Sequence, residues 1–140
     1  MYKHLILFVI IVFLTGATEA QACRCLKPSL EEAIDNATVI IHGKVVNSNR
    51  QALNTRNRLE IIQQWKGDTI QTLTIRGGTN CDFHFKEEEE YVVFAEGDPA
   101  YGYLKASVCN YSAPIAKIED EVWEALKLLE PEPVPEPGGE

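Results

Sequence analysis

The sequence lacks internal repeats, long apolar runs and any excess of basic charge. Its most extended apolar stretch, Leu5–Leu14, is shorter than the roughly 20 residues that a membrane-spanning helix needs. The 7 prolines and 9 glycines in 140 residues are too few for a collagen-like chain. A hydrophobic content of 45% with 24% charged residues also excludes a largely disordered chain. The composition is that of one ordinary globular domain.

The formal net charge is −8, and it is unevenly distributed. Four acids lie in the run Glu87–Glu90, and the C-terminal acids are Glu130, Glu132, Glu136 and Glu140. Acids and bases balance over the rest of the chain. No broad basic face for nucleic acid or for an anionic membrane is therefore expected, and the acidity predicts solubility.

The N-terminal segment has the order of a secretory signal peptide. Lys3 precedes the apolar run, and small residues follow up to Ala20-Gln21-Ala22, which is an A-x-A cleavage site. Cleavage after Ala22 starts the mature chain at Cys23, and cleavage after Ala20 is the competing choice. We expect a signal peptide over 1–22, a domain over 23–130 and an acidic, proline-rich, disordered tail over 131–140. The protein is then secreted, or periplasmic if the host is bacterial.

The mature chain shows five short β patterns between two helical ones. Ser29 and Glu32 form a capping box that starts a short helix ending near Asn36, and apolar residues at helical spacing predict an amphipathic helix over 118–129. The expected strands are 38–47, 59–65, 69–76, 91–95 and 101–107. The polar segment 48–55 between the first two is expected to be a loop.

A mainly β fold with five short strands needs a way to protect its sheet edges. A five-stranded OB-type Greek-key barrel, with a short N-terminal helix and a C-terminal amphipathic helix, is the economical arrangement because closure removes the edges. A β-sandwich is the alternative, although it usually has about seven strands.

Four cysteines lie in the mature chain, at positions 23, 25, 81 and 109. An even number in a secreted chain indicates disulfide bonds. A bond between Cys23 and Cys25 would close a cramped ring, which leaves two connectivities open, and both tie the chain terminus to two distant points. Another possibility is a metal site made of Cys23, Cys25, His42 and His84, although its spacing matches no common zinc pattern.

The same cysteines carry a resemblance to a known family. Cys23-Arg24-Cys25, followed by a short helix and the run 37–45, resembles the start of the tissue inhibitors of metalloproteinases. Further along, the chain resembles the wider netrin-like domain family at residues 65–67, 81–85, 91–95 and 107–109. The resemblance extends over residues 23–129.

The resemblance implies an OB-type barrel with the bridges Cys23–Cys81 and Cys25–Cys109. It also implies that the amine and carbonyl oxygen of Cys23 chelate the catalytic zinc of an extracellular zinc metalloendopeptidase. The residues in contact with the protease would be Cys23, Arg24, Cys25, Gly78, Thr79 and Asn80. The protein would have no cofactor of its own, because the zinc belongs to the protease.

Arg24 departs from the small residue that is usual where the family's side chain enters the protease's specificity pocket. An arginine in an apolar pocket would be an unpaired buried charge, so Arg24 indicates either a protease with an acidic or open pocket or the absence of protease inhibition. The alternative function is a netrin-like extracellular binding module without protease inhibition. An enzyme is not expected, since no cysteine is left over as a nucleophile and no Ser-His-Asp group is indicated.

Overall fold

The structure is a computed structural model that describes residues 23–68, 70–129, 131 and 134. The expected signal peptide over 1–22 and most of the expected tail over 131–140 lie outside the described residues. Among the described residues, no helix is both long enough and apolar enough to cross a membrane.

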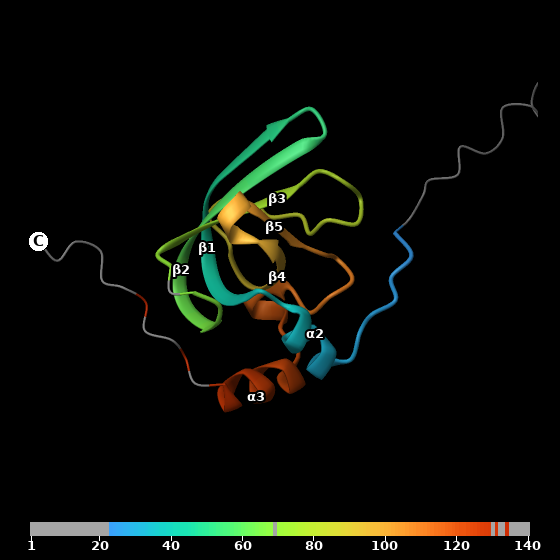
Figure 1. Cartoon of the computed structure of the whole chain (residues 1–140), viewed down its shortest axis with the longest axis vertical. Coiled ribbons are helices and arrows are strands. Elements are labelled where there is room, and N and C mark those ends of the chain that lie inside the picture. The colour runs from blue at the N-terminus through green and yellow to red at the C-terminus, as the bar shows by residue number, and fades with distance from the viewer. Residues whose placement is uncertain (1–22, 69, 130, 132–133, 135–140) are drawn as a thin grey trace, which may run out of the picture.

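Five strands form a closed barrel, with the neighbour order β1-β2-β3-β5-β4 and a further pairing of β4 with β1 (Figure 1). All neighbours are antiparallel except β3 and β5, which are parallel. This arrangement confirms the five-stranded OB-type barrel that the sequence predicted. The strands are β1 (Val39–Gln51), β2 (Asn54–Lys66), β3 (Thr72–Gly77), β4 (Glu90–Asp98) and β5 (Tyr103–Ala106).

Two α-helices and three shorter elements complete the described fold. In α2 (Leu30–Asn36) the expected capping box is present, because the Glu32 amide donates to the Ser29 hydroxyl at 3.2 Å and the Ser29 amide donates to the Glu32 carboxylate at 2.9 Å. The second helix is α3 (Asp120–Leu128). The shorter elements are the 3₁₀ turns η1 (Pro99–Tyr101) and η2 (Ile115–Lys117), and the short strand β6 (Ala113–Pro114), which pairs with β4.

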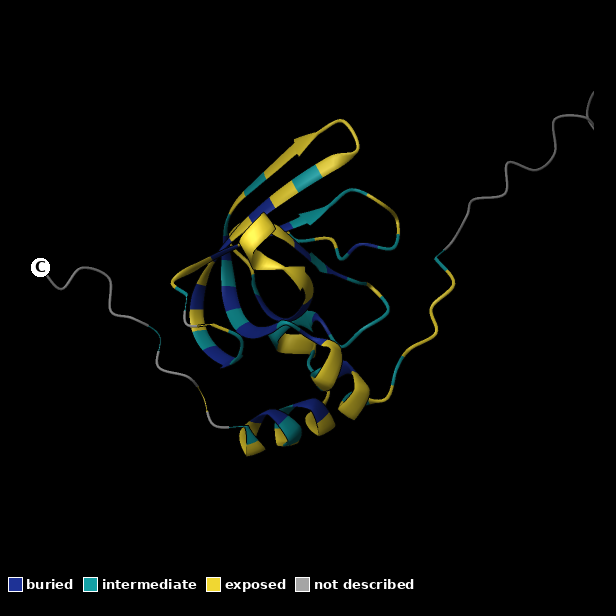
Figure 2. Cartoon of the chain, viewed as in Figure 1, coloured by how far each residue is buried: buried dark blue, intermediate teal, exposed yellow. Residues whose placement is uncertain are grey.

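The core consists of two apolar clusters on opposite faces of the curved sheet. The first fills the barrel and includes Ile41, Leu59 and Tyr91, and the second lies between the barrel wall and the helices. Because successive side chains of a strand point to opposite faces, Val93 belongs to the first cluster and Phe94 to the second. In Figure 2 the buried face of α3 is turned toward the barrel and its exposed face away from it.

The structure corrects the expectation of a polar loop over 48–55. This segment is a hairpin in which β1 and β2 stay paired up to Gln51 and Asn54, so only Ala52 and Leu53 form the turn. The sequence hid the turn because it has no Asn-Gly or Asp-Gly signal, although Ala52 adopts a left-handed φ of 52°. The hairpin side chains are mostly polar because it extends beyond the barrel core.

Candidate functional site

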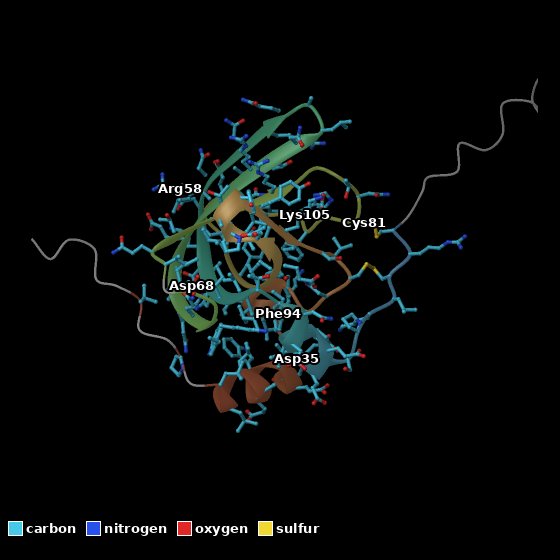
Figure 3. All side chains as sticks on the ribbon, viewed as in Figure 1. Asp35, Arg58, Asp68, Cys81, Phe94 and Lys105 are labelled. Carbon is cyan, nitrogen blue, oxygen red and sulfur yellow. A yellow bond between two sulfur atoms is a disulfide. The ribbon has the colours of Figure 1, made fainter. Side chains whose placement is uncertain are left out.

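Two disulfide bonds hold the start of the described chain against the barrel. Cys23 is bonded to Cys81 and Cys25 to Cys109, with Cα–Cα distances of 5.2 and 5.0 Å (Figure 3). The Sγ atoms of Cys23 and Cys109 lie 3.7 Å apart, so the two bonds pack side by side. This connectivity confirms the pairing that the family resemblance implied. Disulfide bonds are compatible with an extracellular protein.

The two attachment points are themselves joined through the backbone. Cys81 follows β3 and Cys109 follows β5, and the amide of Val108 donates to the carbonyl of Cys81 at 3.0 Å. Next to them, the amide of Phe83 donates to the carbonyl of Ala106 at 2.7 Å. The two disulfide bonds therefore attach residues 23–28, called the terminal segment below, to a single rigid point of the barrel.

The loop over 77–80 is held by one buried carboxylate. Asp82 is 8% exposed, and its Oδ2 accepts hydrogen bonds from the amide and the hydroxyl of Thr79, each at 2.9 Å. Charge-assisted hydrogen bonds of this kind are among the stronger ones in proteins. Thr79 and Asn80 are exposed, so this loop presents a rigid surface immediately before Cys81.

The hairpin tip rests on the same loop. A Cβ placed on Gly78 would overlap the carbonyl oxygen of Leu53, and Gly78 has a φ of +142°. Leu53 itself is 80% exposed. The terminal segment is disulfide-bonded to Cys81, which directly follows the 77–80 loop, and the hairpin turn contacts the same loop. The 77–80 loop therefore connects the terminal segment with the hairpin turn.

The predicted contact residues differ in exposure. Arg24 and Cys25 are exposed, whereas Cys23 and Gly78 are partly buried. The next residue, Leu26, is 95% exposed. The structure thus brings the terminal residues and the 77–80 loop together through Cys81, and it leaves their outer sides open to solvent.

The rear of the terminal segment is anchored to a second point. The Tyr111 hydroxyl donates to the carbonyl of Pro28 at 3.0 Å, and the Lys27 ammonium lies 4.1 Å from the centre of the Tyr111 ring. Lys27 also pairs with Glu119 at 3.4 Å. These contacts fix the segment between the disulfides and α2.

The possible metal site of cysteines and histidines is contradicted. Among the described residues, the one group of side chains with metal-ligand spacing is Cys23, Cys25 and Cys109, and all three are in disulfide bonds. Oxidised cysteine offers no thiolate to a metal. His42 instead lies 2.8 Å from the Glu90 carboxylate.

Two polar clefts flank the hairpin, and sequence reasoning missed both because it treated 48–55 as a loop. One has a volume of about 340 Å³ and is lined by residues of the hairpin together with Arg76. The other, of about 320 Å³, lies between the hairpin and residues 83–85. The alternation of side chains on the paired strands sends Arg56 to the first cleft and Arg50 to the second.

The comparisons with known proteins do not identify the chain. No protein-family model matches the sequence, and no curated protein matches it either.

Proposed function

We propose that the protein is a secreted inhibitor of an extracellular zinc metalloendopeptidase, acting through the amine and carbonyl oxygen of Cys23. The observation that carries the proposal is the double attachment of residues 23–25, because Cys23 and Cys25 are both disulfide-bonded to the barrel. Chain termini are usually frayed. A terminus fixed at two points has its position determined before any partner binds.

The chemistry of the proposal needs only the terminal residue. An α-amino group has a pKa near 8, so its neutral form, which has a lone pair for zinc, is accessible at neutral pH. The amine and carbonyl of Cys23 together form a compact chelate that would displace the zinc-bound water of the protease. Because the disulfides already order the segment, binding loses little conformational entropy.

The surroundings of the terminus support a protein partner. The rigid loop over 77–80 lies beside it, and three exposed apolar side chains surround the area: Leu26, Leu53 and Val108. Exposed apolar side chains grouped around a rigid ridge are typical of protein-binding surfaces. In this proposal the terminal segment enters the protease cleft and the loop forms the second half of the contact.

The decisive experiment compares two forms of the mature protein against a panel of zinc endopeptidases. One form begins at Cys23, and the other carries one additional alanine before it. The additional residue converts the amine into an amide, which is a poor zinc ligand, and fills the space beside the metal. We expect at least about a hundredfold loss of inhibition with an unchanged melting temperature, since the bonds at Cys23 remain.

Acetylation of the Cys23 amine is an independent test, because it removes the lone pair without lengthening the backbone. Equal inhibition by the extended and native forms, or a natural mature chain that begins at Gln21, would contradict zinc chelation by Cys23.

Arg24 determines which proteases can be targets. Its side chain is exposed and forms no ion pair with any described residue, so an acidic or open specificity pocket would accept it. In an apolar pocket the guanidinium would be desolvated without a partner. Arg24→Thr should therefore strengthen inhibition of proteases with apolar pockets and weaken it for those with acidic pockets.

The exposed charge of Arg24 also favours a second candidate, a netrin-like binding module that engages another extracellular molecule without touching zinc. This candidate predicts that the alanine extension leaves binding unchanged. The same pair of proteins therefore separates the two functions.

A further inference from the structure

A row of three cationic residues crosses three neighbouring strands of the barrel. Arg56 on β2 is directly opposite Arg76 on β3, and Arg76 is opposite Lys105 on β5. Like charges directly opposite each other on a sheet repel and destabilise it. In a protein whose net charge is −8, this local concentration of positive charge is unexpected.

The charges of the two arginines are not neutralised by the described part of the chain. Among the described residues, no ion pair includes Arg56 or Arg76. The Nε of Arg76 is buried and has no hydrogen-bond partner among them. The Arg76 guanidinium and the Lys105 ammonium lie over the ring of Tyr103, at 5.6 and 5.4 Å from its centre. Cation–π contacts offset only part of the repulsion.

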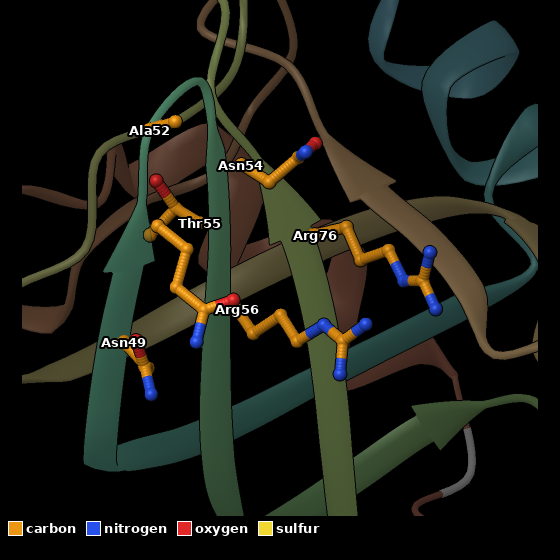
Figure 4. Close-up of a pocket in the computed structure, with 7 residues that line it drawn as sticks. Asn49, Ala52, Asn54, Thr55, Arg56 and Arg76 are labelled. Carbon is orange, nitrogen blue, oxygen red and sulfur yellow. The ribbon is translucent and has the colours of Figure 1, made fainter.

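The two arginines line the cleft of about 340 Å³ beside the hairpin. Figure 4 shows their side chains extending in the same direction from neighbouring strands. Asn49, Asn54 and Thr55 also line the cleft and add neutral donors to the two guanidinium groups. The cleft therefore combines uncompensated positive charge with hydrogen-bond donors.

We infer that this cleft binds a single tetrahedral oxyanion, a sulfate or phosphate group, between Arg56 and Arg76. A guanidinium group presents its N–H donors as a planar fork that matches two oxygens of such an anion. The bound anion also removes the repulsion between the two opposite arginines. Binding and relief of this repulsion then act together.

The acids around the row limit the ligand to one anionic group. Glu96 is opposite Lys105 and Asp98 is opposite Tyr103, so negative charge follows immediately on β4. A long polyanion lying across the strands would meet these carboxylates.

The oxyanion site does not depend on the proposed inhibition. Its lining contains no residue of the terminal segment or of the 77–80 loop. Loss of inhibition in the alanine-extended protein and loss of anion binding in a cleft variant are separate results.

The test is a titration of the mature protein with sodium sulfate and with sodium phosphate, followed by amide chemical shifts, with sodium chloride of equal ionic strength as the reference. We expect saturable shifts around the cleft with both oxyanions. Arg56→Gln and Arg76→Gln should each weaken binding at least about tenfold, since each removes a charged hydrogen-bond donor group. Two variants are used so that the test remains valid if one of them fails to fold.

Two matched controls remove the same charge elsewhere. The first is Arg50→Gln, because Arg50 lies on the same hairpin but lines the other cleft. The second is Arg58→Gln, because Arg58 lies on β2 outside both clefts. Both should bind the anions within about twofold of the native protein. A sulfated disaccharide and its unsulfated counterpart then identify where the bound sulfate group comes from. Tighter binding of the sulfated disaccharide than of free sulfate indicates a sulfate group carried by a saccharide. Equal binding of the two indicates a free anion.

The inference is overturned if the oxyanions produce no saturable shifts, or if chloride reproduces them. It is also overturned if Arg50→Gln or Arg58→Gln weakens binding as much as Arg56→Gln, because the effect would then be general electrostatic attraction.

Discussion

Gly78 lies directly against the backbone of Leu53, so that the Leu53 carbonyl oxygen occupies the place where a side chain at Gly78 would begin. This close approach joins the tip of the β1–β2 hairpin to the loop that leads into Cys81. Leu53, which sequence patterns assign to a loop, thus contacts the 77–80 loop, which is part of the proposed binding surface. The glycine is required there by both space and backbone conformation.

Gly78→Ala should therefore destabilise the protein by about 2 kcal/mol or more, because the new Cβ must displace the hairpin while the residue keeps a positive φ. Chemical or thermal denaturation measures the change. Gly102→Ala is the matched control: its φ of 61° is also positive, but an added Cβ there meets nothing within 4 Å. The control should cost about 1 kcal/mol, and equal losses would show that space at Leu53 is not limiting.

Removing the bond between Cys23 and Cys81 should release residue 23 from the barrel while Cys25–Cys109 still holds residue 25 and the barrel stays folded. The bond joins residues 58 positions apart, for which the chain-entropy account gives a stabilisation of about 4 kcal/mol. The double variant Cys23→Ser/Cys81→Ser should unfold at correspondingly lower denaturant concentration. The control is Cys25→Ser/Cys109→Ser, which removes the other bond over a separation of 84 residues and should cost a similar amount.

The two disulfide variants also separate stability from function. If the position of Cys23 matters, opening the bond at that residue should reduce inhibition more than opening the one at Cys25, although both cost similar stability. Equal inhibition by the two variants at a temperature where both are folded would contradict a role for the first attachment.

Tyr91 predicts how stability changes at alkaline pH. The residue is 2% exposed, its hydroxyl donates to the Glu89 carboxylate at 2.8 Å, and it accepts from the Lys86 amide at 3.0 Å. Burial raises the pKa of Tyr91 above its ordinary value of about 10, and the hydrogen bond to Glu89 raises it further. The folded state therefore holds the phenolic proton at pH values where the unfolded chain has released it.

The free energy of unfolding should consequently fall as the pH rises above about 10, by up to about 1.4 kcal/mol per pH unit, until the folded phenol also ionises. Below pH 10 the contribution is fully present, since both states hold the proton. Denaturation at a series of pH values measures the slope. Tyr91→Phe should lower the free energy of unfolding by about 1 kcal/mol at neutral pH, and above pH 10 that free energy should fall less steeply with pH than in the native protein. An unchanged slope in this variant would show that other groups cause the pH dependence.

Deletion of residues 131–140 tests how much the tail contributes. The sequence predicts almost no burial there, whereas Val134 is partly buried against the barrel cluster. One partly buried valine stabilises by at most about 1 kcal/mol, so the deletion should lower the melting temperature by only a few degrees. Val134→Ala should account for most of that change. A larger fall for the deletion than for the single variant would show that other tail residues pack.

The elements that sequence reasoning predicted correctly depend on local signals. The capping box of Ser29 and Glu32 starts α2 from residues three apart, and the period of two in β1 places Val39 and Ile41 in the same cluster. The period fails in β2, where Gln64 and Trp65 are both buried. Register shifts in the pairing of β1 with β2 account for this, and such shifts depend on both strands at once.

The hairpin was missed for a related reason. Apart from Ala52 and Leu53 in the turn, residues 48–55 are polar on both faces, so they show no apolar alternation. Their strand conformation comes from pairing with each other beyond the barrel. The short strand β6 likewise exists only because it lies beside β4. Elements without an apolar face are determined by their partners, which the local sequence does not reveal.

The amino-acid sequence by itself determined the start of α2, the apolar face of β1 and the presence of four cysteines in a single small domain, because these depend on neighbouring residues and on composition. Only the tertiary structure decided that Gly78 touches Leu53 and that Arg56 faces Arg76. Both pairs are separated by at least twenty residues, and each is brought together by the register of paired strands and by the closure of the barrel. Strand register is a property of the whole sheet, and the proposed functional surfaces depend on it.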